Sequence, residues 1–312
     1  MEEGTGLSPF REAFPERFFD VGIAEEHAVT FAAGIAAQGL RPVAAIYSTF
    51  IQRAADQIIH DVCFQNLPVV FALDRSGLVS EDGETHQGIF DISLFRSVPN
   101  MTILAPAGEE ELFQFLRWAL ECPGPVIIRY PKTTCPSGDP SFSLPLEMGR
   151  GVWVRRVLPE QFYKIGGKNL CLVFTGSLYK EVLDAAFILK SQGVEADIYN
   201  LRFLKPLDED YFVNVLNQYK SAILVEEGNR RGGFGEYISE LALRKNCPCR
   251  LMVLGVEENF DALGTREELL QRTGLDGHGI AEAALKLINR GKNHFKSVAI
   301  SAAAEPVEKF FS

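Results

Sequence analysis

The chain has 312 residues, of which 46% are hydrophobic and 23% are charged, and its formal net charge is −10. This composition excludes a wholly disordered protein, and the acidic balance argues against a surface for nucleic acid or for an anionic membrane. At about 150 residues per domain, the length favours two domains.

No apolar run approaches the roughly 18 residues that a membrane-spanning helix needs, and the N-terminal residues lack the pattern of a signal peptide. The six cysteines show neither a disulfide framework nor the spacing of metal ligands. We therefore expect a cytoplasmic protein with reduced thiols and no membrane partner.

Short β-rich runs alternate with longer helical stretches, which is typical of α/β layering with parallel strands. In chain order, the sequence predicts a strand at 17–23, a helix at 25–38, a strand at 41–48, a helix at 49–64, a strand at 68–74, a polar loop at 75–88, a strand at 102–106, a helix at 108–122 and a strand at 125–131. It then predicts a strand at 169–177, a helix at 179–193, strands at 194–203 and 221–228, a helix at 232–245, a strand at 249–256 and helices at 266–274 and 279–291. We expect an α/β fold with two open, mainly parallel sheets.

The alternation stops between the two parts, where residues 133–166 carry four of the 16 prolines. Such a proline density is typical of a linker. We therefore expect domains at 1–132 and 167–291, a linker at 133–166 and a disordered tail at 292–312. Because the first predicted strand begins only at Arg17, the first domain is expected to lack the strand–helix unit with which an open α/β domain normally opens.

Candidate chemical groups concentrate in the first part of the chain. Glu25 and Glu26 begin a predicted helix, where acids complement the helix dipole, but a fixed and partly desolvated carboxylate can also bind a ring nitrogen of a ligand. Arg53 lies one turn inside the next predicted helix, and it fits a solvated surface residue and an anion ligand equally well. Composition leaves both questions open.

The polar loop at 75–88 contains Arg75, Asp82 and His86, and loops of this length in compact domains are functional or disordered. Lys132 directly follows the strand predicted at 125–131 and fits either a surface charge or a ligand group.

In the second part, the Gly-rich run VEEGNRRGGFGEY (225–237) matches neither a dinucleotide-binding fingerprint nor a Walker A loop, so it predicts a tight turn. Glutamates nearby lack the spacing of metal ligands and are predicted to be rim charges. They are Glu226, Glu227, Glu257 and Glu258.

Three long motifs resemble the pyrimidine-binding domain of the 1-deoxy-D-xylulose-5-phosphate synthase family, whose members are thiamine-diphosphate-dependent relatives of transketolase. The motifs are IAEEHAVTFAAG (23–34), YSTFIQRAADQIIHDV (47–62) and DRSGLVSEDGETHQG (74–88). Three further motifs resemble the transketolase-like C-terminal domain of that family, namely LRFLKPLD (201–208), VEEGNRRGGFG (225–235) and LGTREELLQRTGLDGHGI (263–280).

The resemblance implies a transferase that condenses pyruvate with D-glyceraldehyde 3-phosphate to 1-deoxy-D-xylulose 5-phosphate and CO₂, in isoprenoid and thiamine biosynthesis. It implies thiamine diphosphate and Mg²⁺ as cofactors and a homodimer as the assembly.

The resemblance also implies roles for individual residues. Glu25 would hydrogen-bond N1′ of the cofactor's aminopyrimidine, Phe50 would stack on that ring, and His86 would orient intermediates or relay protons. The pocket for the acceptor phosphate would be lined by Tyr47, Arg53, Arg75, Asp82 and Lys132. Lys132 stands where the family usually has arginine, so this ligand keeps its charge but loses the planar fork. Arg230 and Arg231 replace a more apolar stretch, and no role follows for them.

Nothing in the sequence matches the family's diphosphate-binding domain, which holds the Mg²⁺ ligands. No metal-binding residue is therefore predicted here, and the chain is expected to be the carboxyl-terminal portion of a synthase, inactive alone. One alternative is a pyrimidine-binding and C-terminal subunit that works with a separate diphosphate-binding subunit of a split transketolase-type enzyme. The other is a non-catalytic dimerisation remnant.

Overall fold

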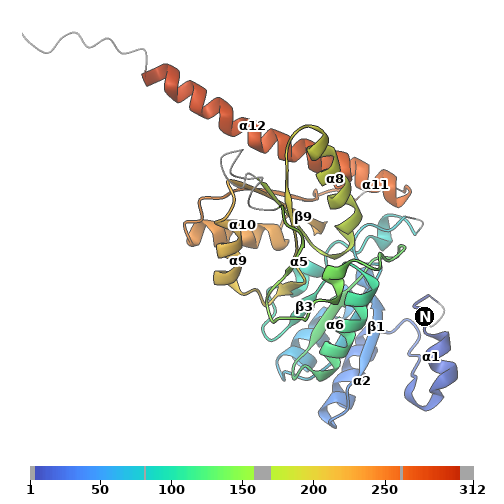
Figure 1. Cartoon of the computed structure of the whole chain (residues 1–312). Coiled ribbons are helices and arrows are strands. Elements are labelled where there is room, and N and C mark those ends of the chain that lie inside the picture. The colour runs from blue at the N-terminus through green and yellow to red at the C-terminus, as the bar shows by residue number, and fades with distance from the viewer. Residues whose placement is uncertain (1–3, 81, 158–169, 261–262, 303–312) are drawn as a thin grey trace, which may run out of the picture.

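The computed structural model describes residues 4–80, 82–157, 170–260 and 263–302 (Figure 1). The chain forms two five-stranded sheets, with strand orders β1-β2-β4-β3-β8 and β10-β9-β6-β7-β5. Every pairing is parallel except at one edge of each sheet, where β8 runs antiparallel to β3 and β5 runs antiparallel to β7. The predicted α/β fold with two mainly parallel sheets is confirmed.

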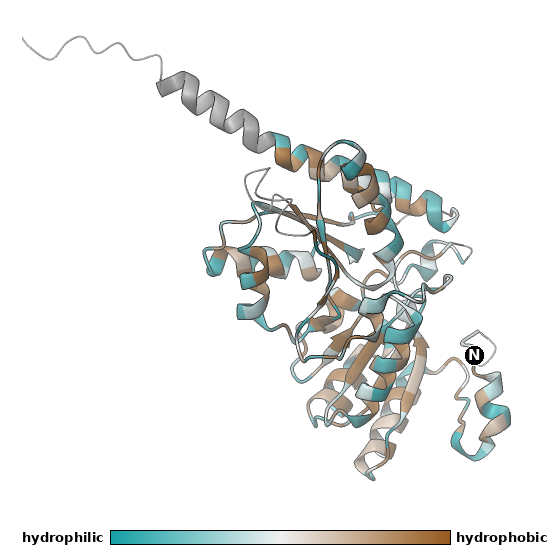
Figure 2. Cartoon of the chain, viewed as in Figure 1, coloured by the Kyte–Doolittle hydropathy of each residue, from teal (hydrophilic) through white to brown (hydrophobic). Residues whose placement is uncertain are grey.

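The first sheet follows the prediction closely. Its parallel strands are β1 (Val43–Tyr47), β2 (Val70–Asp74), β3 (Thr102–Leu104) and β4 (Val126–Arg129). Its principal helices are α2 (Glu25–Ala37), α5 (Asp91–Phe95) and α6 (Glu109–Glu121). The strands β3 and β4 are wholly buried because helices cover the faces of the sheet. This burial suits their sequences, which are apolar and β-branched apart from Arg129 at the end of β4 (Figure 2).

The helix predicted at 49–64 is present but irregular. It is divided into α3 (Ser48–Ile51), a 3₁₀ turn (Gln52–Ala54), α4 (Ala55–Gln57) and a π-helical turn (Ile58–Cys63). Its buried residues, such as Ala54 and Ile58, belong to the same core cluster as Ile46 of β1 and Phe71 of β2. This segment carries Phe50 and Arg53, so the irregularity lies in the part of the chain with candidate site residues.

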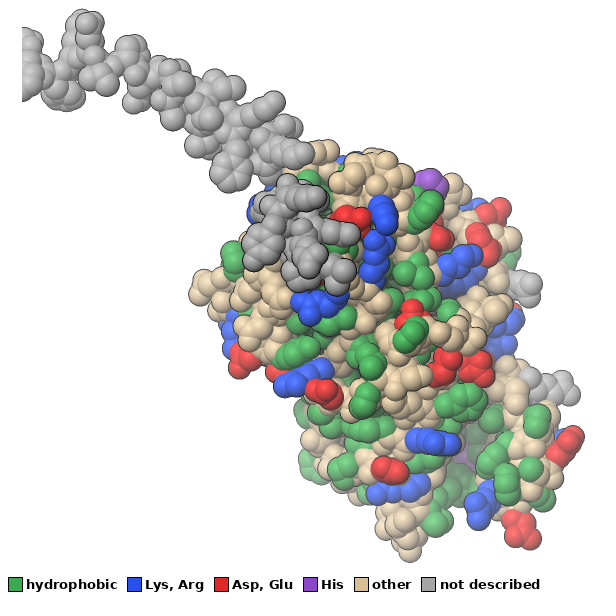
Figure 3. Space-filling view, in the orientation of Figure 1, with side chains coloured by type: hydrophobic (Ala, Val, Ile, Leu, Met, Phe, Trp, Pro, Cys, Tyr) green, Lys and Arg blue, Asp and Glu red, His purple; other side chains and the backbone are tan. Residues whose placement is uncertain are grey.

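The strand predicted at 17–23 is wrong. A 3₁₀ turn covers Pro15–Arg17, and residues 18–24, between this turn and α2, form no strand. The ring of Phe19 packs edge-on against Phe31 of α2 at 5.3 Å, so these apolar residues contact a helix rather than a neighbouring strand. Hydrophobic side chains remain gathered on the surface of this part, near α1 (Ser8–Ala13) (Figure 3).

The second sheet contains β5 (Val152–Arg155), β6 (Leu170–Phe174), β7 (Asp197–Asn200), β9 (Ser221–Asn229) and β10 (Arg250–Val256). Its helices are α8 (Tyr179–Ser191), α9 (Glu209–Leu216), α10 (Phe234–Arg244), α11 (Arg266–Thr273) and α12 (Gly277–Ala302). The sequence missed α9, whose first turn is capped by the Asp208 side chain accepting the Tyr211 N–H.

Helix α12 continues past position 292, where the sequence predicts the start of a disordered tail, and residues 303–312 of that tail lie outside the described residues. No helix in the described part combines the length and apolar character needed to cross a bilayer.

Each sheet is extended by a strand that lies outside its predicted domain. Strand β5 lies inside the predicted linker yet extends the second sheet, and β8 (Phe203–Lys205) from the second part extends the first sheet. Just before β8, the fully buried Arg202 donates a 2.6 Å hydrogen bond to Glu111 of α6. Its guanidinium also donates to three backbone carbonyl groups of the segment 141–145. The segment 133–157 is therefore packed structure that joins the two units.

Candidate active site

The candidate site begins where β1 and β2 end side by side. Tyr47, the last residue of β1, pairs in register with Asp74, the last residue of β2. Carboxyl ends of parallel strands are where open α/β sheets bind ligands. Arg75 follows directly, and its guanidinium carbon lies 3.8 Å from the centre of the Tyr47 ring. This cation–π contact fixes the arginine at the edge of the sheet.

Arg75 is almost fully buried and is held by carboxylates on two sides. Its side chain donates to Oδ2 of Asp74 and, at 3.3 Å, to Oδ2 of Asp82. Lys132 Nζ lies 3.4 Å from the same Asp82 oxygen. Burial opposes ionisation of Asp82, but the hydrogen bond from Arg75 and the charge of Lys132 outweigh it and hold the Asp82 pKa below its usual range. At Asp74, burial prevails and raises the pKa despite Arg75.

Glu25, the first residue of α2, is buried and has an unpaired oxygen. Its Oε1 accepts a 3.0 Å hydrogen bond from Arg53 Nη1, whereas its Oε2 has no hydrogen-bond partner among the described residues. Buried polar atoms are normally satisfied, so Oε2 is open to a hydrogen bond from a bound group. This favours a ligand-binding carboxylate over one that serves only the helix dipole, the question that composition left open.

Phe50 lies between the pair Glu25–Arg53 and the pair Tyr47–Arg75. Its ring stacks on Tyr47 with centroids 5.6 Å apart, the Arg53 guanidinium lies 4.7 Å from its centre, and His86 meets it edge-on at 5.3 Å. The loop that carries His86 is brought there by the Thr49 hydroxyl, which donates to the Thr85 carbonyl at 2.9 Å.

The structure therefore brings all eight predicted site residues into one chain of contacts. This chain runs from Glu25 through Arg53, Phe50, Tyr47, Arg75 and Asp82 to Lys132, with His86 on Phe50.

Sequence reasoning was wrong about two of the four glutamates that it predicted as rim charges. Glu226 and Glu227 are both 0% exposed, because β9 is the second strand of its sheet and its faces are covered. The Glu226 carboxylate accepts the backbone N–H groups of Phe234 and Gly235 at the start of α10, and burial raises its pKa to about 7. Glu257 and Glu258 are exposed, as predicted.

The sequence also missed a buried ion pair beneath the loop. Arg129 of β4 donates to Asp91 at 2.8 Å, and Asp91 accepts the hydroxyl of Ser76, the residue after Arg75. Asp91 and Arg129 belong to no recognisable sequence motif. Their sequence signal is only that Arg129 lies inside an apolar strand, where an unpaired charge is costly.

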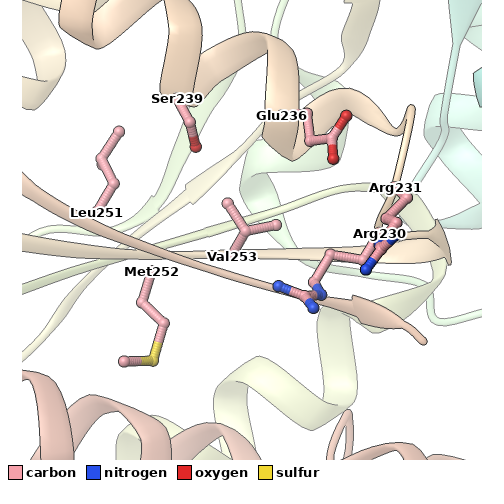
Figure 4. Close-up of a pocket in the computed structure, with 7 residues that line it drawn as sticks. All are labelled: Arg230, Arg231, Glu236, Ser239, Leu251, Met252 and Val253. Atoms are coloured by element: carbon pink, nitrogen blue, oxygen red, sulfur yellow. The ribbon is translucent and has the colours of Figure 1, made fainter. Parts of the chain in front are cut away.

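A pocket of about 530 Å³ opens beside Lys132 and is lined also by Ser80, Thr133 and residues 263–267. A second pocket, of about 460 Å³, lies between α10 and β10 (Figure 4). Its two arginines are each paired with an exposed glutamate, Arg230 with Glu257 and Arg231 with Glu258. Within the described residues, no three His, Cys, Asp or Glu side chains cluster as metal ligands.

Comparison with known proteins identifies the family. Residues 1–137 match the family model for the transketolase pyrimidine-binding domain, and residues 163–280 match that for the transketolase C-terminal domain. A solved split-gene transketolase, described as an inactive β4 tetramer, is 30% identical with a TM-score of 0.78 over 92% of this chain and 89% of that one. This chain belongs to the transketolase family.

Within this family, the chain resembles 1-deoxy-D-xylulose-5-phosphate synthases, as the motifs predicted. The synthase of Treponema pallidum (strain Nichols) is 50% identical over 285 residues, which are 91% of this chain and 44% of the relative. That of Syntrophus aciditrophicus is 46% identical over 298 residues, covering 94% of this chain and again 44% of the relative. The chain thus spans less than half the length of these curated relatives. A Campylobacter jejuni transketolase, 18% identical with a TM-score of 0.67, shares the fold.

Proposed function

We propose that this chain supplies the pyrimidine-binding wall and the acceptor pocket of a 1-deoxy-D-xylulose-5-phosphate synthase. The reaction is the condensation of pyruvate with D-glyceraldehyde 3-phosphate, with release of CO₂. The observation that carries the proposal is the buried, unpartnered Oε2 of Glu25, one contact away from the Phe50 ring through Arg53. The synthases at 50% and 46% identity support the choice of reaction.

The residues present fit the aminopyrimidine of thiamine diphosphate. Arg53 occupies Oε1 of Glu25, so the carboxylate presents Oε2 to a ring nitrogen, and Phe50 offers an aromatic surface beside it. When bound, the cofactor supplies the nucleophilic carbon and the electron sink that pyruvate decarboxylation needs. In this proposal, Glu25 shares a proton with the ring nitrogen through their hydrogen bond. No other proton transfer is proposed for Glu25.

Arg75 and Lys132 form the acceptor pocket in this proposal. Both cations now contact Asp82, and a phosphomonoester dianion would compete with Asp82 for them. Arg75 offers a planar fork, whereas Lys132 offers a point charge. His86 contacts the Phe50 ring edge-on, and in this proposal it moves a proton to or from the substrates.

The remaining partners also belong to the proposal. Mg²⁺ and the cofactor's diphosphate would be held by a diphosphate-binding domain or subunit, and the chain would act as a cytoplasmic homodimer. A second candidate, a subunit of a split transketolase-type enzyme, is favoured by the similarity to the split-gene transketolase, whose whole chain has nearly the same extent as this one.

The test is complementation. The purified chain is incubated with thiamine diphosphate, Mg²⁺, pyruvate and D-glyceraldehyde 3-phosphate, alone and with the separately produced amino-terminal half of the Treponema pallidum synthase. We expect CO₂ release and product formation only in the mixture. A parallel mixture contains a ketose phosphate as two-carbon donor and an aldose phosphate as acceptor, and turnover there without decarboxylation of pyruvate would instead support the split transketolase. Binding of the two halves without any turnover would contradict both and favour a non-catalytic interaction module.

A further inference from the structure

Glu227 and Arg266, both from the second unit, form an ion pair against the site loop of the first. Glu227 lies on β9 and is fully buried, and Arg266 is the first residue of α11. Arg266 meets the carboxylate with both terminal nitrogens, the Nη2–Oε2 distance being 2.7 Å. The Ser177 hydroxyl also donates to Oε2. The position of the ion pair is therefore fixed by contacts within the second unit.

The ion pair binds both backbone groups of one loop residue, Leu78. The Leu78 N–H donates to Oε1 of Glu227 at 2.7 Å, and Arg266 Nη1 donates to the Leu78 carbonyl at 3.0 Å. The preceding residue, Gly77, has φ +88°, and a Cβ there would lie 2.4 Å from the Glu227 carboxyl carbon. Only glycine fits, because the loop backbone passes directly against the carboxylate.

Hydrogen bonds pass this anchoring on to the residues of the site. The Gln87 side chain bonds both backbone groups of Val79, at 2.7 and 3.0 Å. Gly77 and Gly88 exchange two backbone hydrogen bonds, at 2.7 and 2.8 Å. The two arms of the loop are thus tied together. Arg75 lies just before these hydrogen-bonded pairs, Asp82 lies between the two hydrogen-bonded segments, and His86 is adjacent to Gln87.

We propose that Glu227 and Arg266 are positioning residues, through which the C-terminal unit sets the place of the loop that carries Arg75, Asp82 and His86. The role in catalysis rests on the proposed function, but the positioning itself does not. Glu227 lines neither pocket and acts through Leu78, whereas Arg266 holds the same loop residue and also lines the pocket beside Lys132.

Hydrogen exchange of the full chain, followed by mass spectrometry, tests the positioning. Glu227→Gln keeps the shape of the side chain but removes its charge. We expect peptides covering residues 76–88 to exchange about tenfold faster or more, while those from β6 and β7 keep their wild-type rates. The matched control is Glu226→Gln, a buried neighbour on the same strand that contacts α10 instead. It should affect residues near Phe234 and leave the loop unchanged.

Gly77→Ala approaches the same contact from the loop side, and it serves if Glu227→Gln does not fold. An added methyl group must displace the loop or the carboxylate, so the same peptides should lose protection. Loop exchange within twofold of wild type in the folded variants, or an equal rise throughout the chain, would overturn the proposal.

A second readout separates this inference from the proposed function. In the complemented enzyme, Glu227→Gln should raise the KM for D-glyceraldehyde 3-phosphate while leaving that for pyruvate near wild type, and Glu227→Asp should restore part of the loss. If complementation yields no enzyme at all, the proposed function fails, and hydrogen exchange still decides whether the pair positions the loop.

Discussion

Arg53 Nη1 donates a 3.0 Å hydrogen bond to Oε1 of Glu25, while Oε2 of the same carboxylate is buried and accepts none among the described residues. The two side chains differ in exposure, since that of Arg53 is 46% exposed and that of Glu25 is 8% exposed. The arginine thus covers the carboxylate from the solvent side. One oxygen is fixed and the other is left for a donor from within the site.

This asymmetry predicts the effect of removing the charge at Glu25. In the complemented enzyme, Glu25→Gln should lower kcat by about 10²–10⁴-fold, the range for loss of a positioned acid–base group. The matched control is Glu26→Gln, one residue along the same first turn but exposed. If Glu25 served only the helix dipole, both variants would lose a similar 0.3–1 kcal/mol or so of stability and keep their activity. Steady-state kinetics and urea unfolding of both variants distinguish these outcomes.

A second prediction concerns the fork of Arg75. Arg75→Lys keeps the charge but loses the paired geometry that reaches Asp74 and Asp82. We expect the KM for D-glyceraldehyde 3-phosphate to rise about tenfold or more, since a hydrogen bond to a charged group contributes about 1.5–3 kcal/mol. Lys132→Arg should lower that KM, because it restores a fork. Arg231→Lys, at an exposed arginine on the far pocket, is the control. Equal changes in the KM of pyruvate would argue against an acceptor pocket.

The site could be predicted from the sequence to the extent that strand ends determine it. Tyr47 and Asp74 end neighbouring parallel strands, so their proximity follows from the topology alone. The roles at Glu25 and Phe50 came from resemblance to a family, because a glutamate at a helix start has an ordinary explanation as well.

What the sequence did not reveal depends on long-range packing. Phe19 and its neighbours have a strand-like composition, but Phe19 packs against Phe31 of helix α2. Strand β8 pairs with a strand about a hundred residues away, which no local pattern encodes. Glu227 appears polar in sequence and is wholly buried, because its partner Arg266 is 39 residues distant. Spacing rules detect ligands close in sequence and overlook ion pairs formed by the fold.

A third prediction concerns the stability provided by Asp91 and Arg129, whose side chains are both 2% exposed and 2.8 Å apart. Asp91→Asn removes the carboxylate that the buried arginine contacts, so the free energy of unfolding should fall by up to about 3–5 kcal/mol. Glu240→Gln, which breaks an exposed pair with Arg244, should cost no more than about 0.5 kcal/mol. Urea unfolding at neutral pH measures both, and similar losses in the two variants would contradict the argument.

The last prediction is a pH dependence from Glu226. Burial raises its pKa from 4.5 to about 7, although two backbone N–H groups at the start of α10 favour the charged form. Between these two values the folded chain binds more proton than the unfolded chain. This contribution to stability is therefore full below pH 4.5, declines as pH rises, and is lost above pH 7.

Other carboxylates titrate in the opposite sense, so the comparison must isolate Glu226. The Glu227 pKa, for example, is lowered, because the charge of Arg266 and its hydrogen bonds outweigh the effect of burial. We expect the free energy of unfolding of Glu226→Gln, relative to wild type, to increase by about 3 kcal/mol between pH 4.5 and pH 8, since one pKa unit corresponds to about 1.4 kcal/mol. Urea unfolding of both proteins at half-unit steps of pH measures this difference. Two parallel stability curves would show that Glu226 is ionised throughout the range, with the α10 N–H groups and Arg129 overcoming its burial.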